Sequence, residues 1–465
     1  MSNWEEKNYS GIETYVKAKL TELKARAEKY RIIPPEEQYF TIEVISDNTE
    51  LSWLFPSDAD ESFKATIEFS YDNGLTWNSV TAGVGMEGNI GTYAPGDIIL
   101  LRGTGPTGFY DEEELGEAAG NFLYADKPCF VYGNVMSLLY GANFAGQKKI
   151  TQEYAFAYLF SDYDTEYTGE WLRSKAGSPL VLPATTLAAA CYYSMLSRCS
   201  SLTTAPELPA TTLADDCYGT MFGGCTALAT APELPATTLA NFCYATMFQG
   251  CTSLAAAPEL PATTLAERCY NSMFSGCTSL TIAPALPATT LADYCYATMF
   301  FGCTSLATAP ELPATTLAKS CYSNMFVGCT SLTTAPELPA TTLADYCYNS
   351  MFSGCTSLTT APELPVTTLA ERCYSSMFRD CTSLTTAPEL PATTLTDFCY
   401  DGMFYGCTSL ASVKCLASAV SPSSAVNTWL RNVSATGTFT KAAGVSWPTG
   451  SSGIPSGWTV QTASE

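Results

Sequence analysis

The sequence predicts an α+β rod, a solenoid of 26-residue coils preceded by an N-terminal helix and a small β-sandwich domain. The main observation is one motif, in its cleanest form APELPATTLADYCYNSMFSGCTSLTT (335–360), which recurs without a change of register. Nine cysteines mark the period: Cys191, Cys217, Cys243, Cys269, Cys295, Cys321, Cys347, Cys373 and Cys399. A second cysteine follows each of them by eight residues. Before the repeats, short apolar and alternating segments are separated by turn residues, which is typical of a β-domain.

Each repeat should contain a strand followed by a helix. Residues 201–208 (SLTTAPEL) are rich in threonine and are interrupted by a proline, which favours a short strand. In residues 210–224, Thr212 and Asp215 match a capping box, and Gly224 occupies the position that ends a helix. The expected inward face repeats every four residues and contains Leu213, Cys217 and Met221. A strand plus a helix in 26 residues matches the size of a leucine-rich repeat.

The repeat pattern MFxGCTSL…LPATTLA…CY resembles the BspA-like leucine-rich repeats of gut and oral bacteria and of their phages. The likeness extends from about residue 154 to the C-terminus, where residues 427–460 are similar to the terminal cap of those proteins. Residues 68–80 and 133–147 resemble the β-domain and connecting segment that precede such repeats in phage and prophage proteins. The resemblance implies adhesion and surface binding, and it defines no ligand-contacting residues.

Five segments follow from these patterns. Residues 1–37 are predicted to be an anchor or oligomerisation helix, and 38–147 a β-sandwich-like adaptor domain. Residues 148–179 should form a degenerate N-terminal cap of the rod, in which about ten extra residues near 165–174 make a bulge. The leucine-rich repeats occupy 180–410, and a C-terminal cap occupies 411–465.

The N-terminal helix carries a short apolar seam within 12–31. The seam residues lie at steps of four and three, as in a coiled coil, and are Val16, Leu20, Leu23, Ala27 and Tyr30. The other faces are basic although the whole protein is acidic. Two interpretations stay open: a solvated helix packed on its own domain, or a helix that attaches the chain to a partner or to other copies of itself.

Composition excludes several classes of function. The net charge is −23, so the chain lacks the basic surface that a nucleic-acid backbone requires. There is no histidine, which removes Ser–His and Cys–His catalytic pairs and the usual zinc ligands. We therefore expect no enzyme, cofactor or metal site, and we expect the twenty cysteines to be reduced packing residues. No apolar run is long enough to insert into a membrane, and no export signal is recognisable.

Two surface features are candidates for binding. A row of glutamates recurs once per repeat and either binds cations or a basic partner or keeps neighbouring sheets apart. The residue before the first cysteine varies while its neighbours do not, and aromatic and arginine side chains of this kind are enriched in binding hot spots. The predicted ligand-binding face consists of Phe242, Arg268, Tyr294, Tyr346, Arg372 and Phe398. Drift on an unconstrained face is the alternative explanation of this variation.

The order of segments favours a structural virion protein, a phage fibre or appendage assembled in the host cytoplasm. Its N-terminal region would contact other virion proteins and form a homo-oligomer, with a trimer as one option. Its rod would adhere to a host-surface or mucosal glycan or protein. A BspA-like adhesin on a bacterial cell surface and a purely architectural virion part without a ligand are the alternatives.

Overall fold

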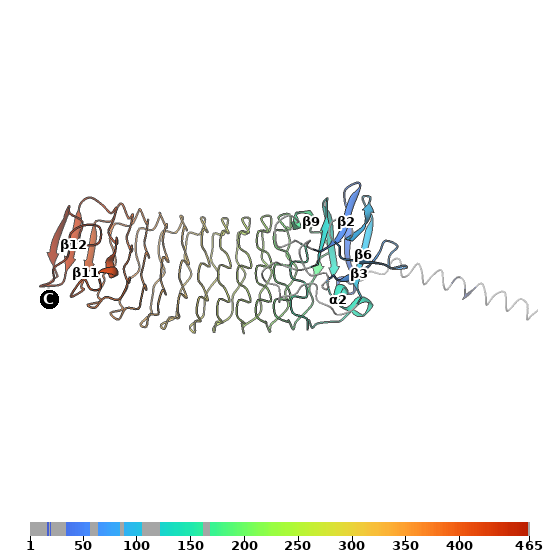
Figure 1. Cartoon of the computed structure of the whole chain (residues 1–465), viewed down its shortest axis with the longest axis horizontal. Helices are drawn as coiled ribbons and strands as arrows, with labels where there is room; N and C mark the ends of the chain where they lie inside the picture. The colour runs from blue at the N-terminus through green and yellow to red at the C-terminus, as the bar shows by residue number, and fades with distance from the viewer. Residues whose placement is uncertain are drawn as a thin grey trace, which may run out of the picture.

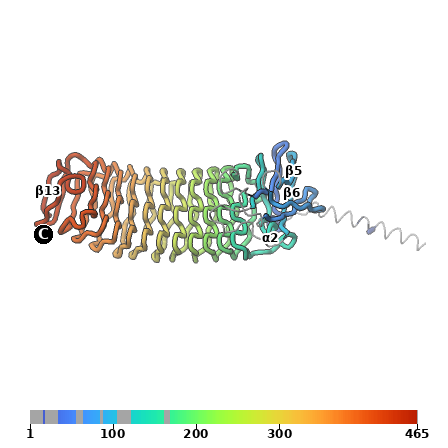
Figure 2. Tube along the Cα trace, viewed as in Figure 1, coloured from blue at the N-terminus to red at the C-terminus, as the bar shows by residue number. Residues whose placement is uncertain are grey.

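The computed structural model describes residues 16, 17, 19, 34–55, 64–83, 88–104, 121–160 and 168–463. The molecule is a long rod with regular strands at both ends and a stack of repeats between them (Figures 1 and 2). Strands dominate the described secondary structure, and α2 (Ser137–Tyr140) is a single turn of helix. The repeating cysteine, tyrosine and phenylalanine positions therefore build a repeat rod, as the period predicts.

Two sheets form the N-terminal β-domain. Its strands are β1 (Phe40–Val44), β2 (Thr49–Leu54), β3 (Thr66–Ser70), β4 (Asn78–Thr81), β5 (Asn89–Tyr93), β6 (Ile98–Gly103), β7 (Phe122–Ala125) and β8 (Cys129–Asn134). One sheet runs in the order β8-β1-β6-β3-β4, and the other runs β5-β2-β7. The β3–β4 hairpin turns at Asn73 and Gly74, which have the positive φ that such turns require. Trp53 of β2 is fully buried, so it is a core residue and offers no surface for binding.

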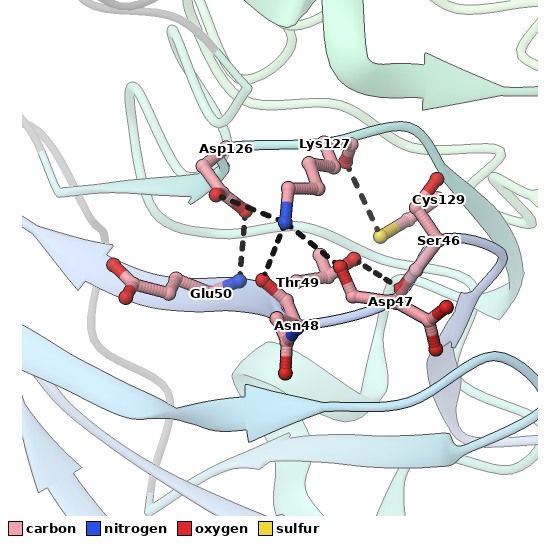
Figure 3. Close-up of polar contacts among 8 residues, drawn as sticks. All are labelled: Ser46, Asp47, Asn48, Thr49, Glu50, Asp126, Lys127 and Cys129. Atoms are coloured by element: carbon pink, nitrogen blue, oxygen red, sulfur yellow. Dashed lines mark hydrogen bonds and ion pairs between the residues drawn. The ribbon is translucent and has the colours of Figure 1, made fainter.

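One lysine joins the two turns at which the chain crosses between the sheets. The Lys127 ammonium, in the β7–β8 turn, donates to the backbone carbonyls of Asp47 and Asn48 in the β1–β2 turn, at 2.8 and 2.7 Å (Figure 3). The neighbouring Asp126 carboxylate accepts the amide of Glu50 at 2.7 Å. Both turns are thereby fixed at one end of the domain. The side chains in this cluster are engaged in structural contacts.

The β-domain continues directly into the rod. After α2 come η4 (Gly141–Asn143), η5 (Gly169–Trp171), β9 (Leu172–Arg173) and β10 (Leu180–Val181). Both β9 and β10 pair with β8 in parallel, so the larger sheet extends to the first coil. A single buried apolar cluster runs from the β-domain through the repeats to the C-terminal cap. Because the core is continuous, the β-domain is a rigid base for the rod.

The first coil of the rod differs from the later coils in the spacing of its hydrogen bonds. The Phe156 amide donates to the Cys191 carbonyl, an offset of 35 residues, whereas the equivalent bond in the repeats joins Tyr218 to Cys243. The offset in the repeats is thus 25 residues, and ten extra residues lie within the first coil. The Phe156 ring stacks on Tyr192 at 5.6 Å and starts the aromatic stack of the rod.

The helix expected in each repeat is wrong. Residues 182–411, all of which the structure describes, contain no helix. The segment expected to be helical is a chain of four-residue turns, in which alternate amides have two kinds of partner. The Gly219 amide donates to Asp216 three residues back, whereas the Thr220 amide donates to Ala245 in the next coil. Half of the hydrogen bonds of this segment therefore join successive coils.

The inward spacing explains this error. Within each coil, two adjacent sets of side chains point into the rod, and each set recurs every four residues. In an α-helix of 3.6 residues per turn, both sets would drift off the buried face. The chain keeps them inward by placing one residue of each turn in the left-handed region: Asp216, Thr220 and Gly224 have φ of 55, 54 and 74°. Asp215 also caps no helix, because its carboxylate accepts the amide of Asn241 in the next coil at 2.9 Å.

The expected strand of each repeat is reduced to isolated bridges, such as Thr230 with Ala256 and Ile282 with Thr308. The PELP sequence explains this, because each of its two prolines lacks an amide hydrogen for a sheet ladder. Where the prolines end, regular parallel strands appear: β11 (Ser412–Cys415), β12 (Gly437–Lys441) and β13 (Trp458–Thr462). They form the C-terminal cap together with η6 (Ser423–Val426).

Stacked side chains fill the rod. Tyrosine rings from Tyr192 to Tyr400 lie 5.7–6.1 Å apart in successive coils, and phenylalanine rings from Phe222 to Phe404 lie 5.5–5.8 Å apart. All twenty cysteines are free and buried. The second cysteine of a coil donates its thiol to a carbonyl of the preceding coil, as Cys251 does to Phe222 at 3.1 Å. The thiols are thus packing groups that also satisfy backbone carbonyls.

Candidate ligand-binding face

The residues before the first cysteine of each coil form one column along the rod, called here the variable column. Its members are Asp216, Phe242, Arg268, Tyr294, Ser320, Tyr346, Arg372 and Phe398. All have φ between 52 and 60°, because each starts the chain of turns in its coil. The amides of the column bond to the next coil, as Phe242 does to Glu267 at 2.9 Å. The six predicted residues therefore occupy one column on a backbone that is hydrogen-bonded from coil to coil.

The structure brings the six predicted residues together as two stacked triads. The Arg268 guanidinium lies over Phe242 on one side and Tyr294 on the other, with its Cζ 5.2 and 4.7 Å from the ring centroids. In the second triad, Arg372 lies 5.6 Å from Tyr346 and 3.9 Å from Phe398. A cation between two rings is attracted by both ring faces. Each triad thus holds its three side chains in a defined orientation.

These contacts modify the predicted face. All six side chains are half-buried, because the rings and guanidiniums cover one another. An acidic neighbour accompanies each arginine: Glu267 lies 3.9 Å from Arg268, and Glu371 lies 3.7 Å from Arg372. The two arginine side chains retain 41 and 31% of their exposure. The face consequently consists of half-buried rings and partly neutralised guanidiniums.

A second variable column lies two residues before the second cysteine. In it the Arg379 guanidinium lies 4.4 Å from the centroid of the Tyr405 ring, and the guanidinium of Arg431 in the cap lies 5.8 Å from the same centroid. Phe301 is 45% exposed in the middle of this column. The arginine–aromatic contact here is confined to the C-terminal end, so this column is the less organised of the two.

The glutamate row is exposed along its length and is interrupted by Ala285. At its C-terminal end the Lys414 ammonium forms an ion pair with Glu389 at 2.9 Å. Pro232, Pro235 and their equivalents flank the carboxylates, and an open groove of about 380 Å³ lies between two such turns. No group of three potential metal ligands occurs among the described residues.

The predicted anchor seam and the tryptophans of the two ends of the molecule are placed as follows. Val16 is helical and 54% exposed, whereas the remaining seam residues, Leu20, Leu23, Ala27 and Tyr30, lie outside the described residues. Trp77 is half-buried beneath the Arg102 guanidinium at 3.9 Å. The cap tryptophans are core residues, because Trp429 and Trp458 are at most 7% exposed and donate to backbone carbonyls.

The thiols are unsuited to nucleophilic chemistry. Desolvation by burial is the largest cause that raises the pKa of Cys251 and Cys303 to about 12, and the other thiols shift in the same direction. A nucleophilic cysteine needs a lowered pKa and an accessible sulfur. Among the described helices, none combines the length and apolar character needed to cross a bilayer.

No protein-family model matches the chain, and comparisons with curated proteins and with solved structures likewise find no match. Functional argument therefore rests on the residues themselves.

Sequence reasoning found the variable column but missed its internal pairing. The order Phe, Arg, Tyr, Ser, Tyr, Arg, Phe from Phe242 to Phe398 reads the same in both directions. In a stack with one residue per coil, an arginine between two aromatic residues has a ring on each side. That order was the available signal for the triads.

Proposed function

We propose that the chain is a structural virion protein, a phage fibre or appendage, whose rod adheres to a glycan or protein on a host surface or in mucus. The observation that carries the proposal is the variable column with its two triads. In a rod whose inward positions are nearly constant, the column places aromatic and arginine side chains on one edge. Several such contacts on one extended ligand reinforce one another through effective concentration.

The rod is proposed to be a leucine-rich-repeat solenoid of the BspA-like type in which turns replace the helix. Support comes from the 26-residue period and from the buried leucines, such as Leu228 and Leu234, that recur in every coil. The rigid junction between β8 and β10 supports an attachment role for the N-terminal part, because a base fused to the rod transmits its orientation. A cellular surface adhesin with the same rod is the second candidate, and the repeated surface supports it equally.

Adsorption measurements on one variant test the adhesive role. Replacing Tyr294, Tyr346 and Phe398 with serine removes one ring from Arg268 and both rings from Arg372. The stacked core residues are untouched, so the variant should fold. We expect binding of the labelled protein to host cells or immobilised mucin to fall at least tenfold.

A matched control removes an exposed ring from another column. Phe301→Ser should leave binding within twofold, because Phe301 lies outside the variable column. Normal binding by the triple variant would place the site elsewhere and refute the adhesive column. Mass spectrometry of purified particles separates the virion from the cell-surface candidate, since the chain must be found in the particle for the first to hold.

A further inference from the structure

The C-terminal cap ends in a strand whose outer edge pairs with no other strand of the described chain. β11, β12 and β13 form a parallel sheet in that order, so β13 has a neighbour on one side only. β13 lies at the end of the rod that is farthest from the β-domain (Figure 2). Along a strand, successive residues direct their amides and carbonyls to opposite sides. The Ala463 amide donates to Lys441 of β12 at 2.9 Å, so the amides and carbonyls of Val460 and Thr462 point outward.

The apolar core also stops short at this edge. In the register of the sheet, Val413 of β11 pairs with Phe439 of β12, and Phe439 pairs with Val460 of β13. Paired residues of neighbouring strands lie on the same face of a sheet. Val413 and Phe439 are 1 and 0% exposed, whereas Val460 is 46% exposed. Val460 therefore ends an inward apolar column with one side uncovered, and the sheet at β13 can accept one more strand in both its backbone and its side chains.

β13 lacks the features by which proteins protect such an edge. Charged side chains, prolines and bulges usually block the approach of another strand. The strand reads Trp458, Thr459, Val460, Gln461, Thr462, and its pairing with β12 runs without a shift of register over these five residues. Threonine and valine favour extended structure. The edge is thus open to strand addition, in which main-chain hydrogen bonds give affinity and alternate side chains give specificity.

The charge of the cap distinguishes this end from the rest of the rod. Residues 411–465 contain three basic residues, Lys414, Arg431 and Lys441, and one acidic residue, Glu465, in a chain whose net charge is −23. The glutamate row along the repeats repels an acidic segment and attracts a basic one. An extended segment that is neutral or acidic is therefore directed to the cap, away from the glutamate row.

We propose that β13 is a docking strand, to which a partner protein adds an extended segment at the outer edge of the cap sheet. The segment forms hydrogen bonds with the backbone of Val460 and Thr462 and places an apolar side chain beside Val460. Its remaining residues are neutral or acidic. The inference goes beyond the proposed function, because no residue of the variable column lies in the cap.

Peptide binding to the full chain tests the edge, with fluorescence anisotropy as the measurement. The probe is a short labelled peptide of alternating threonine and valine with an aspartate at each end. Its matched control has the same sequence with the threonine and valine amides N-methylated, which removes the donors and keeps the charge. The probe should bind at least about tenfold more tightly than the control, because main-chain hydrogen bonds supply the affinity of an added strand.

Two variants separate the backbone of the edge from its side chain. Val460→Pro removes the outward amide and keeps the bonds to β12, since an edge strand accepts proline where the N–H faces outward, and it should weaken binding at least about tenfold. Val460→Thr keeps that amide and should weaken binding only about two- to threefold. Hydrogen exchange checks the fold: the Gln461 amide, which faces β12, should stay protected in both variants. In the parent protein the Val460 and Thr462 amides should exchange freely and become protected when the probe binds.

Several results would overturn the proposal. They are protection of the Val460 and Thr462 amides in the free chain, equal binding of the probe and its N-methylated control, and parental affinity in a folded Val460→Pro variant. Should Val460→Pro disturb the cap, the exchange of the parent protein and the N-methylated control still decide. A chain beginning at Gln38 that is dimeric, and that Val460→Pro makes monomeric, would assign the edge to a second copy and refute the partner. None of these measurements involves adsorption by the triple serine variant, so the adhesive column and the docking strand can fail separately.

Discussion

Replacing Ser272 with glycine distinguishes the chain of turns from the helix that the sequence pattern favours. Ser272 lies mid-segment with φ of 55°, and its amide donates to Ala297 in the next coil at 2.9 Å. A residue with a Cβ atom loses about 1–2 kcal/mol in this left-handed conformation. Glycine avoids that loss but costs about 0.5–1 kcal/mol in conformational entropy of the unfolded chain. The variant should therefore be more stable by about 0.5–1 kcal/mol.

A helix would give the opposite sign. In a helix interior, glycine is about 0.5 kcal/mol less favourable than serine. Gly402 already occupies the equivalent position with φ of 59°, so the fold accepts glycine there. The reciprocal variant is Gly276→Ala, at φ of 74°, where the new Cβ would lie 3.6 Å from Gly250 and would not clash. It should lose about 1–2 kcal/mol from backbone conformation alone.

Urea unfolding measures both effects, with equal slopes required for comparison of the midpoints. Hydrogen exchange at the Ser272 amide provides a local measurement, because long repeat arrays need not unfold in one step. The turn geometry would be refuted if Ser272→Gly lowered the midpoint and the protection of this amide while Gly276→Ala had no effect.

Two further predictions concern the ends and the core of the molecule. The full chain should be oligomeric by light scattering and a chain beginning at Gln38 should be monomeric, because the shorter chain lacks the apolar seam through Val16 and Leu23 that is expected to join the copies. The seam is too short to associate without the adjoining domain, so the comparison uses the full chain. Identical masses for each protein's particle relative to its chain would refute the anchor. The rod should unfold as pH rises from about 9 toward 12, with nearly twenty thiols reacting only after unfolding. Burial raises the pKa of Cys347 from 9.0 to about 12, so folding holds protons that the unfolded chain releases, and stability is lost as pH rises through this window. Thiol titration at pH 7 and circular dichroism across the window check this, and reactive thiols in the native protein would contradict it.

The sequence indicated the repeat rod and its inward columns because strict periodicity leaves few ways to bury the same residues in every coil. The helix was wrong because Leu213, Cys217 and Met221 satisfy two geometries at short range. Residues spaced four apart stay on one face of an α-helix for only about two turns. In a chain of four-residue turns they stay on the same face however long the chain is. The hydrogen bonds that decide between them join different coils, and no local pattern contains that information.

The candidate site shows the same division between what is local and what depends on stacking. Choosing the variable column required only a comparison of repeats. Recognising the triads required the neighbour of each residue along the rod, which lies 26 positions away in the sequence. Arg268 has Phe242 and Tyr294 as its partners. Its neighbours in the chain are Glu267, which is exposed, and Cys269, which is buried in the core. In a repeat rod, the surface contacts of a residue are therefore made mainly with the equivalent residues of the two adjacent coils. A substitution on the surface should accordingly affect the side chains of those two coils most.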